Sequence, residues 1–442
     1  MNKHSLSISK IIHGGFGFGQ LPDGRVAMVR QALPGEEVVI AVEEEKKSFL
    51  IGNIVSITAA SPFRIDPPCP YYHTCGGCDL QHAAYGEQLR IKRDILIDLL
   101  TRQKNLNQTD IHCPIAATLP SPRQSGYRQR IRLWIKDGTA AGFRQHRSHN
   151  IVAVRRCHIA REELNLSLAS LLDHPLTLKL FANSSELELL FNPLSTRVTA
   201  LIHLTRKPRP ADSSAAAKLI EEIDILERIV FTGQHFPQTT GAPAADNNIL
   251  GQRHEPMGIL SQPFTMQWEV GGFCQVNLEQ NTHLIRIVCE YAAIRPDETV
   301  LDLFCGYGNF SIPLAATAYS LLGIEGQGSA IRSAKANSRN AGLTNTTFLK
   351  KPIHPACEEL VTAGESFDCL VIDPPRQGIP GLAADLHALC RKRMVYISCD
   401  PATLSRDLGD LTAAGFKITR IQPIDMFPET HHIETVVLLE KH

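Results

Sequence analysis

The chain has 442 residues, of which 43% are hydrophobic and 20% charged, which is typical of a folded globular protein and excludes a disordered or fibrous chain. At roughly 150 residues per domain, this length predicts about three domains. Lys plus Arg and Asp plus Glu both number 45, which excludes a generally polycationic coat for nucleic acid but allows a local basic patch. No apolar run approaches the roughly 18 residues that span a bilayer, and the start lacks a secretory signal, so we expect a cytoplasmic protein without a membrane segment.

Residues 1–61 are predicted to form a small β-barrel. Short apolar runs such as 26–30 and 38–42 alternate with turn signals, among them Pro22-Asp23-Gly24. Closely spaced short strands of this kind are typical of small barrels. The glycine-rich run 13–19 could let the backbone approach RNA, although tight turns are the simpler explanation for its glycines.

Three of the twelve cysteines, Cys69, Cys75 and Cys78, lie within ten residues of one another. Disulfide frameworks are rare in proteins that are not exported, so this group indicates a metal site. Four thiolates bind either one zinc ion or an iron–sulfur cluster, and the spacing alone leaves both open. A helix is predicted over 83–105, where apolar residues recur at helical spacing.

The segment 121–160 is unusually basic, with nine Lys or Arg residues opposed within the segment by a single acid, Asp137. Arg128, Arg130 and Arg132 alternate along a predicted strand and would therefore line one of its faces. Aromatic residues are interleaved with these arginines. A basic strand face with aromatic side chains is what RNA phosphates and unstacked bases require, so we expect this segment to bind RNA.

The segment 206–247 is rich in Pro, Ala, Ser and Asn and is predicted to be a loop. From about residue 290 onward, apolar β-type runs alternate with helical segments, which predicts a doubly wound parallel sheet. The expected strands cover 299–304, 321–325, 369–373 and 394–398, and the expected helices include 327–341 and 402–414.

The first of these strands runs into a turn that contains Gly306 and Gly308. The glycines permit a tight turn and let a ligand lie against the backbone. Glu325 ends the next strand, 19 residues after Gly306, where an acid can accept hydrogen bonds from ribose hydroxyls. Ser311 replaces the last glycine of the dinucleotide fingerprint, which disfavours a dinucleotide and favours S-adenosylmethionine.

Asp373 ends a later strand, and Pro374 and Pro375 stiffen the loop that follows it. Ligands of open α/β sheets bind at this end of the strands. An Asp-Pro-Pro motif also occurs in amino-group methyltransferases, so it does not identify the reaction.

Cys399 and Glu434 identify the reaction more closely. Cys399 follows the strand 394–398, at the same predicted sheet edge as Asp373. Carbon 5 of uracil is a weak nucleophile, and a thiolate that adds to carbon 6 places negative charge at carbon 5. After methylation a base must remove the carbon 5 proton so that the thiol can leave. One Cys and one carboxylate are the minimum set for this chemistry.

With these motifs the chain resembles the bacterial RNA uracil-5 methyltransferases, in particular the branch that acts on 23S ribosomal RNA and carries an iron–sulfur cluster. The resemblance covers nearly the whole chain and is most specific around Cys399 and Glu434. It implies that Cys399 is the nucleophile, that Glu434 is the proton acceptor, and that Phe273 lies near the extruded uracil. It also implies four ligands for a [4Fe-4S] cluster: Cys69, Cys75, Cys78 and Cys157.

The same resemblance implies contacts with S-adenosylmethionine, some of them close to the target base. These residues are Gln275, Phe304, Asn309, Glu325 and Asp373. One position departs from the family. Where relatives often have an Asn or an acid near the adenine, this chain has Pro352, which cannot make that side-chain hydrogen bond. Cofactor affinity is therefore in doubt at this position.

The resemblance implies a multidomain α+β chain. Residues 1–61 would form a TRAM-like or OB-like RNA-binding barrel, residues 62–262 a central iron–sulfur α+β domain with the basic strands, and residues 263–442 a Rossmann-like class I methyltransferase domain. We expect a monomer that methylates carbon 5 of one uridine in 23S ribosomal RNA. The alternatives are the same reaction on transfer RNA, an amino-group methyltransferase that uses Asp373, and a non-catalytic RNA-binding assembly factor.

Overall fold

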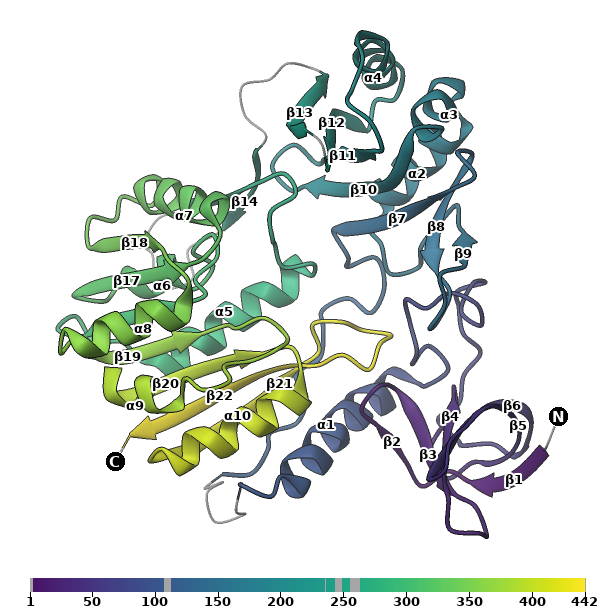
Figure 1. The fold of residues 1–442 in the computed structure, drawn as a ribbon, viewed down its shortest axis with the longest axis horizontal. Coiled ribbons are helices and arrows are strands. Elements are labelled where there is room, and N and C mark those ends of the chain that lie inside the picture. Colours follow the sequence, from purple (N-terminus) through teal and green to yellow (C-terminus); the bar gives the residue numbers. More distant parts are fainter. Residues whose placement is uncertain (1–2, 107–112, 235, 243–248, 255–262, 442) are drawn as a thin grey trace.

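A computed structural model describes residues 3–106, 113–234, 236–242, 249–254 and 263–441. Its strands form three large sheets, each in a different part of the chain, and one two-stranded ribbon (Figure 1). The ribbon pairs β14 (Ile249–His254) with β15 (Phe264–Glu269). Among the described residues, no helix combines the length and the apolar character that crossing a membrane requires.

The first sheet is the predicted barrel. Its order is β1-β5-β6-β4-β3-β2, so β1 and β2 lie at opposite ends of the order although only two residues separate them in the chain. The sheet must therefore close on itself. Gly19 is explained by this packing, because a Cβ there would lie 2.3 Å from the side chain of Leu6. The strands are β1 (Lys3–Ser7), β2 (Lys10–Ile12), β3 (Phe16–Gln20), β4 (Val26–Arg30), β5 (Glu37–Glu45) and β6 (Phe49–Ala59).

The central sheet has the order β13-β12-β11-β10-β7-β8-β9, and three helices cover one of its faces with an apolar core. The prediction that 206–247 is a loop is wrong, because α4, β12 and β13 all lie within it. The elements are β7 (Arg130–Lys136), β8 (Ala140–Arg144), β9 (Ile151–Ala153), α2 (Glu162–Asp173), α3 (Pro175–Phe181), β10 (Ser184–Asn192), β11 (Arg197–Leu204), α4 (Pro210–Glu222), β12 (Leu226–Gly233) and β13 (Phe236–Ala242).

The third sheet has the order β18-β17-β16-β19-β20-β22-β21. Helices pack on both faces, so the predicted doubly wound architecture is confirmed, with β22 antiparallel to both of its neighbours. Its strands are β16 (Thr299–Leu303), β17 (Ser320–Glu325), β18 (Thr346–Lys350), β19 (Phe367–Ile372), β20 (Cys390–Ser398), β21 (Phe416–Ile424) and β22 (Glu434–Lys441). Its helices are α5 (Leu278–Ala292), α6 (Ser311–Ala315), α7 (Gly328–Asn340), α8 (Ile353–Thr362), α9 (Ala383–Leu389) and α10 (Pro401–Ala413).

Helix α1 (Tyr85–Arg102) lies between the barrel and the third sheet (Figure 1). Ile91 and Ile95 pack against Ile11 and Leu33 of the barrel, and Leu96 packs in the same apolar cluster as α10. The helix that the periodicity predicts over 83–105 is thus confirmed. It connects parts of the chain that are far apart in the sequence, while the domain boundaries at 61 and 262 stay a prediction.

Candidate active site and cysteine cavity

Strand register brings Cys399, Glu434 and Asp373 to one edge of the third sheet. In the antiparallel pair of β20 and β22, Ser398 lies opposite Thr435. Cys399 follows Ser398 and Glu434 precedes Thr435, so both adjoin the last facing pair of the two strands, although 35 residues separate them in the chain. Strand β19 runs parallel to β20 with Ile372 beside Tyr396, so Asp373 leaves the sheet at the same edge.

The acidic groups at this edge hold their protons more strongly than usual. Burial and the charge of Asp373 raise the pKa of Glu434 well above its ordinary value. Burial and the charge of Glu325 raise the pKa of Asp373 to about 7. Burial, with the charges of Glu434 and Asp373, raises the pKa of the Cys399 thiol to about 12, while Arg376 lowers it. Because these groups lie within electrostatic reach, ionising one makes it harder to ionise the next.

The predicted glycine turn follows β16 and has the backbone that a tight turn requires. Phe304, Gly306 and Gly308 all have positive φ angles, of 61°, 54° and 90°. A Cβ at Gly306 would meet nothing within 4 Å, so the turn leaves open space beside the backbone. The carboxylate of Glu325 accepts hydrogen bonds from the backbone N–H of Gly306 (3.3 Å) and of Gln327 (2.8 Å). The acid that the sequence predicts for the ribose therefore does lie beside the turn.

Asn309 is held by residues that the sequence analysis did not single out. Its amide exchanges two hydrogen bonds with the amide of Asn281 in α5, at 2.9 and 3.0 Å. The hydroxyl of Tyr307 donates to the same Asn309 oxygen at 3.1 Å. Asn281 carries no motif of its own, so only the fold reveals it.

The segment that contains Phe273 and Gln275 joins the central sheet to the third sheet. The side-chain amide of Gln129, just before β7, donates to the backbone oxygen of Gln275. The guanidinium of Arg130 donates to the backbone oxygen of Gly272 at 2.7 Å. Gln275 itself is buried, whereas Phe273 is 61% exposed. Phe273 is therefore free to contact a large partner.

Several arginines of the basic segment have acidic partners outside it, although Asp137 is the single acid within the segment. Arg130 makes a bidentate pair with Glu188 (both 2.9 Å), and Arg132 pairs with Glu186. Both acids lie on β10, more than 50 residues away in the chain. Arg128 lies just before β7, which begins at Arg130. Its Nε donates to the backbone oxygen of Arg130 at 3.0 Å.

The same face of the central sheet carries stacked cations and an aromatic ring. The guanidinium of Arg144 lies 3.9 Å from the ring centre of Trp134, and that of Arg132 lies 5.6 Å from it. In register, Trp134 faces Gly142 on β8 and Glu186 on β10. This cation and aromatic surface lies opposite the helix-covered face of the sheet.

The four predicted cysteine ligands line one cavity of about 200 Å³. Cys69, Cys75 and Cys78 come from the segment before α1, and Cys157 comes from the segment between β9 and α2. Within the described ranges, no group of three or more His, Cys, Asp or Glu side chains is arranged to hold a metal ion. A single zinc ion requires its sulfur ligands about 2.3 Å from one point. Four thiols that border one cavity could hold either a zinc ion or an iron–sulfur cluster.

Comparisons with known proteins agree with this geometry. Residues 6–55 match a model of the TRAM domain, and residues 252–442 match a model described as tRNA (Uracil-5-)-methyltransferase. A protein of Vibrio campbellii named 23S rRNA (uracil(1939)-C(5))-methyltransferase RlmD is 31% identical, over 99% of this chain and 96% of its own length. The protein of the same name from Vibrio parahaemolyticus is 32% identical, with the same coverage.

A crystal structure of the Pyrococcus abyssi tRNA (uracil-54, C5)-methyltransferase with S-adenosyl-L-homocysteine covers 98% of this chain and 100% of its own. Its TM-score is 0.72 at 24% sequence identity, a level that establishes a shared fold.

Proposed function

The chain belongs to the RNA (uracil-5-)-methyltransferase family, and from this premise we propose that it methylates carbon 5 of a uridine in 23S ribosomal RNA. The substrate is proposed because relatives that align over almost their full length carry that activity in their names. Transfer RNA is the second candidate, because the matching family model and the archaeal structure are both described by it. Work on ribosomal RNA would place the enzyme in the cytoplasm.

The observation that carries the proposal is that Cys399 and Glu434 both adjoin the last facing pair of β20 and β22 and lie within electrostatic reach of each other. The sulfur of Cys399 adds to carbon 6 of the uracil, which moves the electrons of the carbon 5–carbon 6 double bond towards carbon 5 and the carbonyl oxygen. Carbon 5 then forms a bond to the methyl carbon. Glu434, in its ionised form, takes the proton from carbon 5, the double bond re-forms, and the bond between carbon 6 and sulfur breaks.

The thiol must lose its proton as the sulfur attacks. The high pKa of Cys399 means that the free protein holds it as a thiol at neutral pH. Asp373, with a pKa of about 7, is a neighbouring carboxylate that can accept this proton. The target base must leave its stack to reach Cys399, and the exposed ring of Phe273 offers a surface for it.

S-Adenosylmethionine supplies the methyl group and leaves as S-adenosylhomocysteine. The open backbone at Gly306 fits a ligand that lies against the turn. Glu325 borders that turn and has lone pairs left for ribose hydroxyls. We propose that the cofactor is held by Gln275, Phe304, Asn309, Glu325 and Asp373. Pro352 directly precedes α8 in an extended conformation and offers no side-chain hydrogen bond there.

We further propose that Cys69, Cys75, Cys78 and Cys157 hold a [4Fe-4S] cluster. Their convergence on one cavity supports this ligand set. Iron–sulfur clusters take four cysteine thiolates, often three from one short segment and one from a distant segment. The reaction described above needs no electron transfer, and the bound cluster would join the two segments that carry its ligands.

The test is methyl transfer by the purified enzyme to transcripts of 23S ribosomal RNA and of transfer RNA. We expect 5-methyluridine in the ribosomal transcript. Cys399→Ala should abolish methylation, and Glu434→Gln should accumulate a covalent enzyme–RNA adduct that survives a denaturing gel, because the final proton transfer fails. A fully active Cys399→Ala enzyme would contradict the mechanism, and methylation of transfer RNA alone would establish the second candidate.

A further inference from the structure

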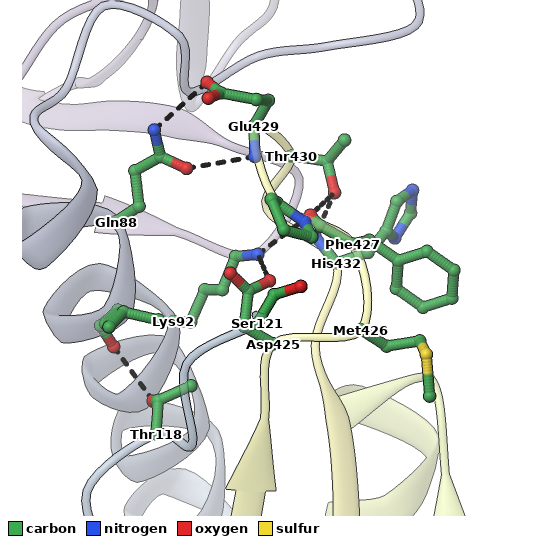
Figure 2. A network of polar contacts seen from close by, with 12 residues as sticks. Gln88, Lys92, Thr118, Ser121, Asp425, Met426, Phe427, Glu429, Thr430 and His432 are labelled. Carbon is green, nitrogen blue, oxygen red and sulfur yellow. Dashed lines mark hydrogen bonds and ion pairs between the residues drawn. The ribbon is translucent and has the colours of Figure 1, made fainter. Parts of the chain in front are cut away.

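The loop 425–433 joins β21 to β22 and ends at Glu434. Its first residue, Asp425, is fully buried and pairs with the fully buried Lys92 of helix α1. The ammonium of Lys92 also donates to the backbone oxygen of Phe427 at 2.9 Å. Figure 2 shows the Lys92 side chain extending from α1 to both groups. A buried ion pair whose hydrogen bonds are satisfied holds its two elements in one relative position.

A second contact fixes the middle of the loop. Gln88, one helical turn before Lys92, makes two hydrogen bonds with Glu429 (Figure 2). Its amide nitrogen donates to the Glu429 carboxylate at 3.1 Å, and its amide oxygen accepts from the Glu429 backbone N–H at 3.0 Å. Glu429 has a φ of 70°, in the left-handed region that residues other than glycine rarely adopt. Such a conformation persists when the surroundings impose it.

A third contact comes from the segment that directly follows Cys78. The backbone N–H groups of Asp79 and Leu80 both donate to the backbone oxygen of Glu429, at 3.1 and 3.0 Å. The carboxylate of Asp79 accepts from the backbone N–H of His431 at 2.7 Å and also contacts the His431 ring. The loop that leads to Glu434 is therefore held along its length by elements outside the third sheet.

We propose that Gln88, Lys92 and Asp79 are positioning residues that hold the loop 425–433 so that Glu434 meets the carbon 5 proton. This inference rests on the proposed role of Glu434 as the final base. Cys399 follows β20 and the glycine turn follows β16, so both are attached to strands that this loop does not join, whereas Glu434 directly follows the loop as the first residue of β22. Loosening the loop should therefore slow the last step and leave thiol addition and methyl transfer nearly intact.

The experiment uses the full-length enzyme, a 23S ribosomal RNA transcript and S-adenosylmethionine labelled in its methyl group. The label is counted separately in the protein-bound adduct and in free RNA during a single turnover. For Gln88→Met we expect label to enter the adduct at nearly the wild-type rate. Its release as free methylated RNA should be about ten- to a hundredfold slower, because a small misplacement of a reacting group has effects of this size.

Arg93→Met is the matched control. Arg93 is also in α1, and its guanidinium donates to the backbone oxygens of Ile115 and Ala116 rather than to the loop 425–433. Both variants thus lose hydrogen bonds from the same helix, and their thermal unfolding is compared first. A second test variant, Lys92→Met combined with Asp425→Leu, removes both charges of the pair so that neither is left buried alone.

Adduct accumulation in Gln88→Met and in the double variant, but not in Arg93→Met, supports the inference. Equal accumulation in Arg93→Met, or none in either test variant, overturns it, because the effect would then be general loosening or absent. Glu434→Gln is run alongside. If that variant accumulates no adduct, the proposed role of Glu434 fails, and the positioning inference fails with it. If it does accumulate adduct while the test variants do not, only the positioning inference fails.

Discussion

At Asp373, burial and the charge of Glu325 work against ionisation and raise the pKa to about 7. Glu298 behaves in the opposite way, because hydrogen bonds from Arg393 lower its pKa to about 2. Both residues are carboxylic acids of the third sheet region; Glu298 is buried and Asp373 is partly buried. The difference is that Glu298 has cations beside it, whereas Asp373 has carboxylates.

This difference predicts opposite effects of neutralising the two residues. The pKa of Asp373 is higher in the folded protein than in the unfolded chain, so folding becomes less favourable as pH rises from about 4 through about 7. Asp373→Asn should therefore raise the free energy of unfolding at pH 8 by up to roughly 4 kcal/mol and change it little at pH 4. Glu298→Gln should lower the free energy of unfolding at pH 8, because the ionised Glu298 is stabilised by Arg393. Urea unfolding at the two pH values measures both, and an unchanged Asp373→Asn curve at pH 8 would contradict the argument.

Residue by residue, the sequence predicts groups that carry a chemical motif and misses those defined by a distant partner. Cys399, Glu434 and Asp373 could be identified because strand ends and flanking residues mark them. Lys92 and Asp425 lie 333 residues apart, and nothing local joins them. One signal was available: Lys92 lies beside Ile91 on the apolar side of a predicted helix, where a charged residue requires a partner.

At the level of elements, the pairing of β7 with β10 decides how much positive charge the basic strand presents for the proposed contact with RNA. Arg132 is half exposed and forms an ion pair with Glu186, which is mostly buried. In the sequence the arginines seemed unopposed because β10 follows β7 by about 50 residues, and antiparallel pairing cannot be read from local charge. This face therefore presents the guanidinium of Arg132, whose charge is partly neutralised by Glu186 on the neighbouring strand β10.

We expect opposite changes in RNA affinity when the two partners of the Arg132–Glu186 ion pair are neutralised one at a time. Arg132→Gln should weaken binding of a 23S ribosomal RNA fragment. It should also reduce the slope of log affinity against log salt concentration by about one. Glu186→Gln should strengthen binding, because it frees Arg132 for phosphate. Lys218→Gln is the control, since Lys218 is exposed on α4, on the helix-covered side. Fluorescence titrations at several salt concentrations give both quantities, and equal slopes for Arg132→Gln and wild type would exclude a phosphate contact.

Elements with strong periodicity could be predicted, and elements formed by tertiary pairing could not. The strands and helices after residue 290 follow the expected alternation closely. Helix α4 was missed although Pro210 stands at its first turn and Asp212 caps it, both recognised signals for a helix start. The Ala- and Ser-rich composition of the segment obscured them. Strand β13 has little pattern of its own and is defined by its pairing with β12.

Across the whole molecule, the cysteine segment 69–82 contacts all three large sheets or their loops. Gln31 of the barrel region donates to the backbone oxygen of Tyr72, and Gly76 donates to the backbone oxygen of Arg144 in β8. Leu80 donates to Glu429 in the loop before β22. A short segment with no helix or strand of its own joins these parts, so whatever orders this segment also orders the assembly of the molecule.

The proposed cluster is the agent that would order it, and this predicts a measurable loss in Cys157→Ser. Cys157 lines the same cavity but lies 79 residues after Cys78 in the chain, so among the four proposed ligands its removal breaks the one long-range connection. We expect the anaerobically purified variant to lose most of its iron and its visible absorption, and its unfolding temperature to fall by several degrees relative to wild type. Cys113→Ser is the control, because Cys113 lies outside the cavity. A Cys157→Ser protein that keeps four irons per chain would show that Cys157 is not a ligand. Loss of iron with unchanged unfolding would mean that the cluster does not hold the molecule together.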